Sequence, residues 1–144
     1  MKAPNPEFEA VVRESFGRQT FMSALGAKVE RVAPGEVDIS VPFNPGYSQQ
    51  NGFLHAGVIT SIADSACGYS ALSMAPPAHD VLAVEFKINL LRPATSPSFL
   101  ACAKVVRAGR TLTVAMAEVF GITGSQRVLV ATMMSTVIAR PIPG

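Results

Sequence analysis

The 144-residue sequence is poor in charge, has few cysteines and contains no long hydrophobic run. Charged residues make up only 15% of the chain, whereas hydrophobic residues make up 49%, which is a low charge content for an ordinary domain. A monomer of this composition has few charges with which to cover its surface, so we expect part of its apolar surface to be buried in a homo-oligomer. The length is that of one domain, and residues 1–144 are expected to form a single unit.

These absences exclude several classes of partner. A net charge of +2 without any run of Lys and Arg argues against nucleic-acid binding. No apolar run reaches the roughly 18 residues that a membrane span needs, and the start MKAPNPEFEA lacks the apolar region of a signal peptide. The sequence therefore predicts a cytoplasmic protein with no nucleic-acid or membrane partner. Cys67 and Cys102 lie in apolar stretches without metal-ligand spacing, so both are expected to be buried free thiols.

Hydrophobic periodicity predicts two helical regions and six strands. Residues 1–26 are expected to be helical, because apolar side chains recur there with the spacing of one helical face. Residues 57–74 form the longest helical candidate, with two β-like runs before it and four after it. A long helix on one face of a mostly antiparallel sheet is an α+β layer architecture.

The run VLAVEFKINLL, after the long helix, alternates with period two, which predicts a half-buried strand. On this pattern the apolar side chains share one face of the strand and the remaining ones share the other. The apolar set comprises Leu82, Val84, Phe86, Ile88 and Leu90, and the other set comprises Ala83, Glu85, Lys87 and Asn89.

One acid, Asp64, interrupts the apolar long helix. A buried carboxylate is costly unless it is paired or hydrogen-bonded. Asp64 could lie on a solvated stripe, since Ser61, Ser65 and Gly68 occupy compatible helical positions. Alternatively, it is a general base or nucleophile whose pKa is set by an apolar pocket. Periodicity alone leaves both interpretations open.

The residues HAG at the start of this helix suggest a second functional group. Backbone N–H groups at a helix start lack partners within the helix, and the positive end of the helix dipole lies there. The N–H groups of Ala56 and Gly57 could therefore stabilise a substrate oxyanion. His55 is expected to cap or orient the helix start, because no Ser or Cys lies at a spacing typical of a catalytic triad.

Ala56 and Asp64 are too far apart to act on one carbonyl within a single chain. Eight residues separate them, which is about 12 Å along a helix axis. If both act on one substrate, the aspartate must come from the antiparallel helix of a second subunit. This reasoning predicts a two-fold homodimer with active sites at its interface.

The stretch NGFLHAGVITSIADSACGYSA resembles the signature of PaaI-like (phenylacetic-acid-degradation type) hotdog-fold acyl-CoA thioesterases. His55 and Asp64 have the spacing of that signature. VEFKINLLRPA and VVRAGRTLTVAMAEV resemble the family's next strand and its Gly-Arg turn, and the similarity spans about residues 35–139. The resemblance implies a hotdog fold, in which a strongly curved six-stranded sheet wraps around the long helix. It also implies hydrolysis of an acyl-CoA, without a metal or redox cofactor, in a dimer or a dimer of dimers.

Site roles follow from the same resemblance. Asp64 would be the base or nucleophile. The N–H of Ala56 would hold the thioester oxygen, with the N–H of Gly57 as a second donor, and His55 would orient the helix start. Asn51 would help to hold the carbonyl, with Gln49 and Gln50 as alternatives because loop lengths vary here. The family's first glycine after the histidine is Ala56 here, which keeps the N–H. Ala83 is a further candidate, because some relatives place a Ser or Thr that binds water at this position. The candidates for the acyl pocket are Phe53, Leu54 and Tyr69. The candidates for binding the CoA phosphates are Arg110, Arg107, Lys87 and Arg92.

Two other functions remain possible from the sequence. A hotdog hydratase or dehydratase would need a His and an acid placed for proton abstraction, and no hydratase-type motif is present. A non-catalytic acyl-CoA binding or sensing module would have no need of Asp64. Thiol release from acyl-CoA esters by the wild type and by Asp64→Asn separates these alternatives.

Overall fold

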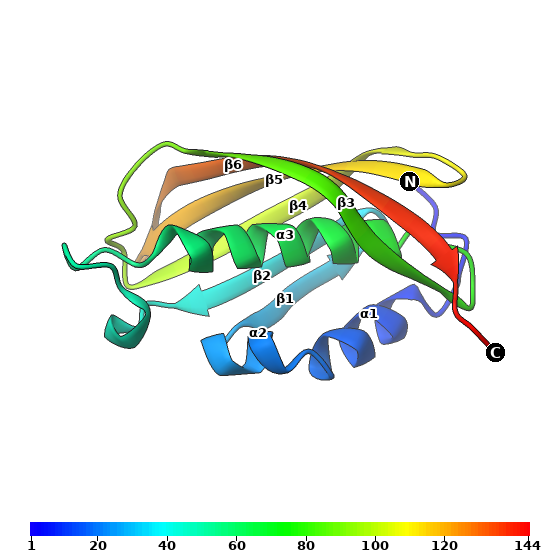
Figure 1. Ribbon diagram of the computed structural model, residues 1–144, viewed down its shortest axis with the longest axis horizontal. Helices are drawn as coiled ribbons and strands as arrows, with labels where there is room; N and C mark the ends of the chain where they lie inside the picture. The colour runs from blue at the N-terminus through cyan, green and yellow to red at the C-terminus, as the bar shows by residue number, and fades with distance from the viewer.

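A six-stranded antiparallel sheet curves around one long helix in the computed structural model, which describes all residues 1–144 (Figure 1). The helices are α1 (Phe8–Gly17), α2 (Thr20–Leu25) and α3 (Ala56–Leu72), with a short 3-10 helix at Pro45–Tyr47. The strands are β1 (Lys28–Ala33), β2 (Glu36–Pro42), β3 (His79–Leu90), β4 (Ser98–Ala108), β5 (Leu112–Thr123) and β6 (Gln126–Pro141). The α+β prediction is confirmed, and α3 lies within two residues of the predicted span 57–74.

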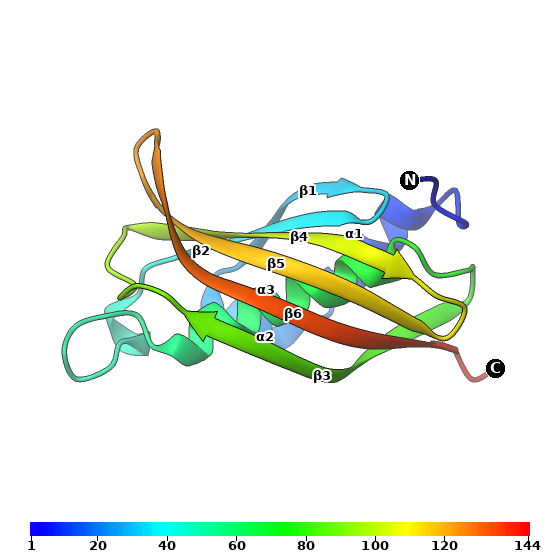
Figure 2. The same cartoon turned by 90° about the horizontal axis from the view of Figure 1, so that it is seen from above.

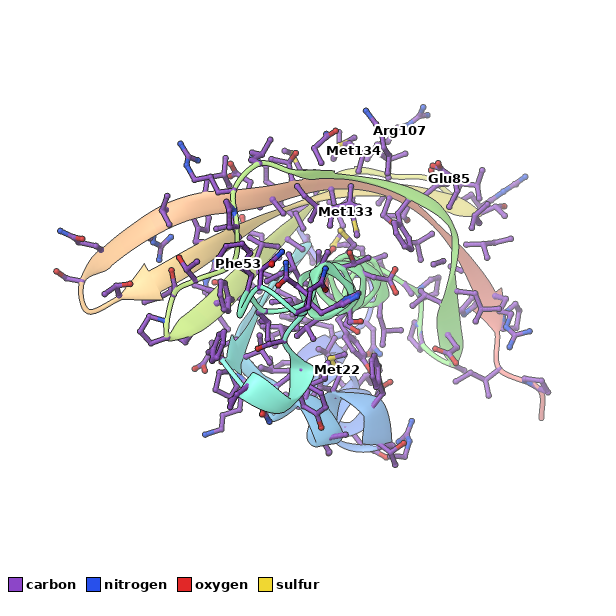
Figure 3. The ribbon with its side chains drawn as sticks, turned by 60° about the vertical axis from the view of Figure 1, so that its left-hand side comes forward. Met22, Phe53, Glu85, Arg107, Met133 and Met134 are labelled. Atoms are coloured by element: carbon purple, nitrogen blue, oxygen red, sulfur yellow. The ribbon has the colours of Figure 1, made fainter.

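The core lies between the concave face of the sheet and α3. Ten of the 17 residues of α3 are buried, which agrees with a helix that is apolar around most of its circumference. Figure 3 shows neighbouring residues of β6 on opposite sides of the sheet: Met133 points toward α3, whereas Met134 points away from it. Met133 is 2% exposed and Met134 is 47% exposed. This alternation is the period-two pattern of a sheet with one covered face.

The predicted helical segment 1–26 forms two helices, α1 and α2, on the side of α3 that faces away from the sheet (Figure 3). α2 ends at Gly26, whose φ of 72° is the left-handed conformation that glycine adopts easily. Met22 and Leu25 of α2 are buried in the core. The long helix is thus covered by the sheet on one side and by the N-terminal helices on another.

The strand order is β1-β2-β4-β5-β6-β3, so β1 and β3 are the two edges of the sheet (Figure 2). Every neighbouring pair is antiparallel. β3 pairs only with β6, and the backbone groups of its other side have no strand beside them. Four large apolar side chains of this 12-residue edge strand are more than 40% exposed: Leu82, Val84, Phe86 and Leu90.

The predicted alternation along β3 is wrong in its first half. A bulge lies between Ala83 and Glu85, so Val84 has no opposite residue on β6. Ala83 pairs with the buried Val137, and Phe86 pairs with the buried Ser135. Ala83 and Phe86 therefore face α3 together, whereas Leu82 lies on the outer face. An extra residue in one strand shifts every side chain before it to the opposite face of the sheet.

The cysteines are free, but only one is buried. Cys67 lies inside α3 with no exposed surface, as predicted. Cys102 is half-buried, on the convex side of β4 opposite Asp38 of β2, so the expectation that it is buried is wrong. None of the helices combines the length and apolarity needed to cross a membrane.

Candidate functional site

His55 forms the N-cap of α3. Its φ of −59° and ψ of 138° are extended, and its Nδ1 accepts a hydrogen bond from the N–H of Gly57 at 2.7 Å. A side chain at position 57 would place its Cβ 2.9 Å from that nitrogen, so glycine gives the imidazole its space. The backbone N–H of Val58 donates to the His55 carbonyl at 2.9 Å. His55 thus organises the first turn, as its predicted orienting role requires.

Ala56 carries the remaining backbone N–H of this first turn. Neither a carbonyl nor a side chain accepts a hydrogen bond from it. Because it lies at the positive end of the 17-residue helix α3, this donor is suited to an anionic oxygen. The N–H of Gly57 is already bonded to His55, so Ala56 is the better of the two predicted oxyanion donors.

A cavity of about 330 Å³ opens beside Ala56, between the start of α3 and the segment that follows β3. Phe53 and Leu54, which were predicted for substrate binding, lie in its wall, and so does Gln49. The side-chain oxygen of Gln49 accepts hydrogen bonds from backbone N–H groups of its own loop, which fixes the amide in place. Asn51 and Gln50 are exposed residues outside this wall. Of the three amide candidates, Gln49 alone shares a cavity with Ala56.

Asp64 lies in a second cavity, of about 290 Å³, between α1, α3 and the start of β3. Its carboxylate takes part in no ion pair, and no hydrogen bond to it is found. Burial raises the pKa of Asp64 above the ordinary value for aspartate, because an apolar environment disfavours the charged form. Ala83 lies in the same wall, on the face of β3 that the bulge turns toward α3.

Polar residues far from Asp64 in the sequence also line its cavity, among them Gln19 and Ser15. Gln19, between α1 and α2, donates from Nε2 to the Tyr69 hydroxyl at 3.0 Å and accepts from the Ser65 hydroxyl at 3.2 Å. The Ser15 hydroxyl lies 3.4 Å from that of Tyr69. Tyr69 was expected to line the acyl pocket. The sequence carries no signal for Gln19 or Ser15, because their place depends on how α1 packs against α3.

The two cavities share no lining residue. Ala56 and Gln49 belong to one, and Asp64 and Ala83 belong to the other. A single chain therefore holds the proposed oxyanion donor and the proposed base in separate places, as their spacing along the helix predicted.

The predicted CoA-binding arginines are exposed and make no ion pair. Arg110 lies in the turn between β4 and β5, where Gly109 is required because a Cβ there would meet the Leu112 carbonyl oxygen at 2.4 Å. Arg107 points away from α3, on the convex side of the sheet (Figure 3). Arg92 lines the Ala56 cavity and donates to the Leu129 carbonyl at 2.7 Å.

Comparisons with known proteins agree with this fold. A thioesterase family protein from Silicibacter pomeroyi has the same fold, with a TM-score of 0.91 and 42% identity over 93% of this chain and 98% of that one. The E. coli PaaI protein from the phenylacetic acid degradation operon superposes with a TM-score of 0.84 at 20% identity, covering 99% of this chain and 98% of its own. The fold is therefore the hotdog fold, and the resemblance to PaaI-like proteins is confirmed.

Sequence matches point the same way. A predicted esterase of Saccharolobus solfataricus is 33% identical over 94 residues, which is 65% of this chain and 66% of that protein. The model of the thioesterase superfamily matches residues 51–127, a segment that contains α3, the Ala56 N–H and Asp64. The chain belongs to the thioesterase superfamily and is a hydrolase.

Proposed function

We propose that this protein hydrolyses acyl-CoA thioesters, with Asp64 as the base or nucleophile and the Ala56 N–H as the oxyanion donor. The observation that carries this proposal is the Asp64 carboxylate, which is half-buried in a cavity and forms no ion pair or hydrogen bond. Keeping such a group costs folding stability, as is typical of residues retained for chemistry.

The reaction needs only groups that the chain supplies and one water molecule. As a base, Asp64 takes a proton from water while the water oxygen attacks the thioester carbon. The Ala56 N–H then stabilises the negative charge on the carbonyl oxygen. The C–S bond breaks, the CoA sulfur takes a proton, and the free acid leaves. As a nucleophile, Asp64 would attack the thioester carbon and displace the CoA sulfur, which takes a proton. Water would then cleave the resulting anhydride to the free acid and the Asp64 carboxylate. Neither route needs a metal or redox cofactor.

The proposed site is completed by a second copy of the chain. The free edge of β3 and its exposed apolar side chains are suited to antiparallel pairing with the β3 of a partner. A two-fold axis beside β3 makes the two α3 helices antiparallel, so that each Asp64 cavity meets the helix start of the other subunit. A dimer, alone or in a dimer of dimers, therefore supplies both functional groups to each site.

Gln49 is the amide that we propose for holding the substrate carbonyl, in place of Asn51. It shares the Ala56 cavity, and its loop bonds fix its orientation. The thioesterase SAV0944 of Staphylococcus aureus, a neighbour in fold, has been solved with a glutamine replaced and with a glutamate replaced, at positions 15 residues apart. Gln49 and Asp64 have the same separation.

CoA recognition is assigned to exposed arginines. Arg110 lies two residues before Leu112. Leu112 pairs with Ile138, which pairs in turn with Leu82, the neighbour of Ala83 in the wall of the Asp64 cavity. Arg92 lies in the wall of the other cavity. Both guanidinium groups lack a carboxylate partner, so they are available for the phosphates of CoA. Arg107, on the convex face, is the weaker candidate.

The test is thiol release from a panel of acyl-CoA esters by the wild type and by Asp64→Asn. We expect kcat/KM to fall by about 10²–10⁴ in the variant. The matched control is Asp38→Asn, since Asp38 is another half-buried aspartate whose pKa is raised by burial, but it lies on β2 outside both cavities. Equal losses in the two variants, or full turnover by Asp64→Asn, would refute the role of Asp64. Tight binding of the esters without turnover would favour a sensing module, and hydration of an enoyl-CoA would favour a hydratase.

A further inference from the structure

The wall of the Asp64 cavity that faces α1 is polar and organised by hydrogen bonds. Gln19 spans Ser65 and Tyr69, and the Tyr69 ring is held by an edge-to-face contact with Phe16, with ring centroids 5.8 Å apart. Tyr69 is only 7% exposed. A group held by three neighbours is in a fixed position before any ligand arrives, which favours selective recognition.

This wall keeps hydrogen-bonding capacity that the protein does not use. The Tyr69 hydroxyl accepts from Gln19 Nε2 and from the Ser15 hydroxyl, so its own hydrogen is available for a ligand. The Gln19 amide donates one of its two hydrogens to Tyr69, which leaves the second without a partner. Both spare donors belong to residues of the cavity wall.

The charges around the cavity limit what such a ligand can be. Two carboxylates, Asp64 and Asp80, lie in its wall, and no Lys, Arg or His does. A ligand group that bears a negative charge would be repelled, whereas a neutral oxygen can accept from Tyr69 and Gln19. A hydroxyl fits best, because it can also donate to a carboxylate.

We propose that Gln19 and Tyr69 are specificity-determining residues that read a neutral oxygen, such as a hydroxyl, at the far end of the acyl group. This inference rests on the proposed thioester hydrolysis at Asp64. Tyr69 follows Asp64 by five residues on α3, so the polar wall lies up to about 7.5 Å from the carboxylate along the helix axis. Acyl chains of about six carbons therefore bring a terminal oxygen to it.

A purely structural role is the competing explanation, since the same bonds tie the α1–α2 junction to α3. Loss of such a tie would lower stability and the turnover of every substrate alike. A specificity role changes the ratio between substrates instead. The selectivity ratio therefore separates the two explanations, where activity on one substrate does not.

The experiment compares kcat/KM for hexanoyl-CoA, 6-hydroxyhexanoyl-CoA and adipoyl-CoA, which carry a methyl, a hydroxyl and a carboxylate at the same chain end. The variants are Gln19→Met and Tyr69→Phe, which keep the size of each side chain, with Gln126→Met at the exposed first residue of β6 as the control. For the wild type and the control we expect the hydroxy ester to be preferred over the plain ester by about tenfold, and the carboxylate ester to be the poorest. In both variants this ratio should fall toward one.

Two results would overturn the inference while leaving the proposed function intact. In the first, the wild type cleaves hexanoyl-CoA at least as well as the hydroxy ester. In the second, the variants lose activity on both esters in equal proportion. A wild-type protein that cleaves none of a broad panel of acyl-CoA esters would instead overturn the proposed function, and this inference with it.

Discussion

Two aspartates of this protein are half-buried, and burial raises the pKa of each. They differ in their neighbours. Around Asp38, the Arg31 guanidinium and a hydrogen bond with Cys102 act against the rise, whereas no charge or donor compensates Asp64. The cost of burying Asp38 is thus partly offset by its neighbours, whereas that of burying Asp64 is not. A carboxylate without compensation in a cavity is the residue from which chemistry is expected.

The raised pKa of Asp64 determines the direction in which activity changes with pH. Its ionised form is needed for either proposed role, and burial disfavours that form. We therefore expect kcat/KM to be low in acid and to rise with pH through a midpoint above the ordinary aspartate value of 3.8. The measurement is kcat/KM for one acyl-CoA ester from about pH 4 to 8, with circular dichroism to check that the fold persists.

A midpoint of the rise in kcat/KM at or below the ordinary aspartate value, or activity that falls as pH rises over this range, would contradict the proposed role of Asp64.

The raised pKa of Asp64 also has a consequence for stability. The folded protein holds the Asp64 proton more tightly than the unfolded chain, so this group's contribution to stability is present at low pH. It is lost as pH rises through the folded-state pKa. Asp64→Asn should therefore be more stable than the wild type at neutral pH and should match it in acid.

At the residue scale, the sequence was informative where function depends on local spacing. His55, Ala56 and Asp64 lie on one helix, so their relative positions follow from helix geometry alone. Gln49 could not be separated from Asn51 and Gln50, because the cavity wall depends on the path of a loop. Gln19 was missed for a related reason: 46 residues separate it from Ser65, to which it bonds.

At the scale of elements, the β3 bulge sets which side chains face α3. Strict alternation would have directed Leu82 to the core and Ala83 outward. The extra residue at Val84 reverses this and brings Ala83 to Asp64. No glycine or proline marks the bulge in VLAVEFKINLL. The periodic pattern therefore predicted the strand correctly, but it predicted the wrong face of the sheet for the first side chains. Bulges near active sites commonly redirect a side chain in this way.

The β1–β2 turn is tied to the end of α3 by one buried serine. The Ser73 hydroxyl accepts from the Gly35 N–H at 2.8 Å and donates to the Ser70 carbonyl at 2.7 Å. Ser73→Ala leaves the Gly35 N–H without this partner, which should cost about 1–3 kcal/mol of unfolding free energy. Denaturant unfolding measures it, with Ser23→Ala on an exposed position of α2 as the control. Equal stability of the two variants would show that the tie contributes nothing.

At the scale of the whole molecule, the proposed dimer would explain both the low charge content and the open β3 edge. A 12-residue edge strand with exposed apolar side chains invites association unless it is protected. Burying β3 against the β3 of a second copy would remove the free edge. It would also cover apolar surface that a chain with only 15% charged residues leaves exposed. In the proposed dimer, the same pairing would bring each Asp64 to the other subunit's Ala56, which one chain cannot do, since its two cavities share no residue.

Mixed dimers test this shared site directly. Ala56→Pro removes the proposed oxyanion N–H with little change of backbone, since proline is favoured at the first helical position and the extended φ and ψ of His55 suit a residue before proline. Asp64→Asn and Ala56→Pro should each be nearly inactive alone. In a mixed dimer, one site combines an intact Asp64 from one subunit with an intact Ala56 from the other. Unfolding and refolding the two variants together in equal amounts should therefore restore about a quarter of wild-type activity, since about half the dimers are mixed and each has one whole site. If both groups acted within one chain, the mixture would stay as inactive as its parts, because every chain lacks one of them.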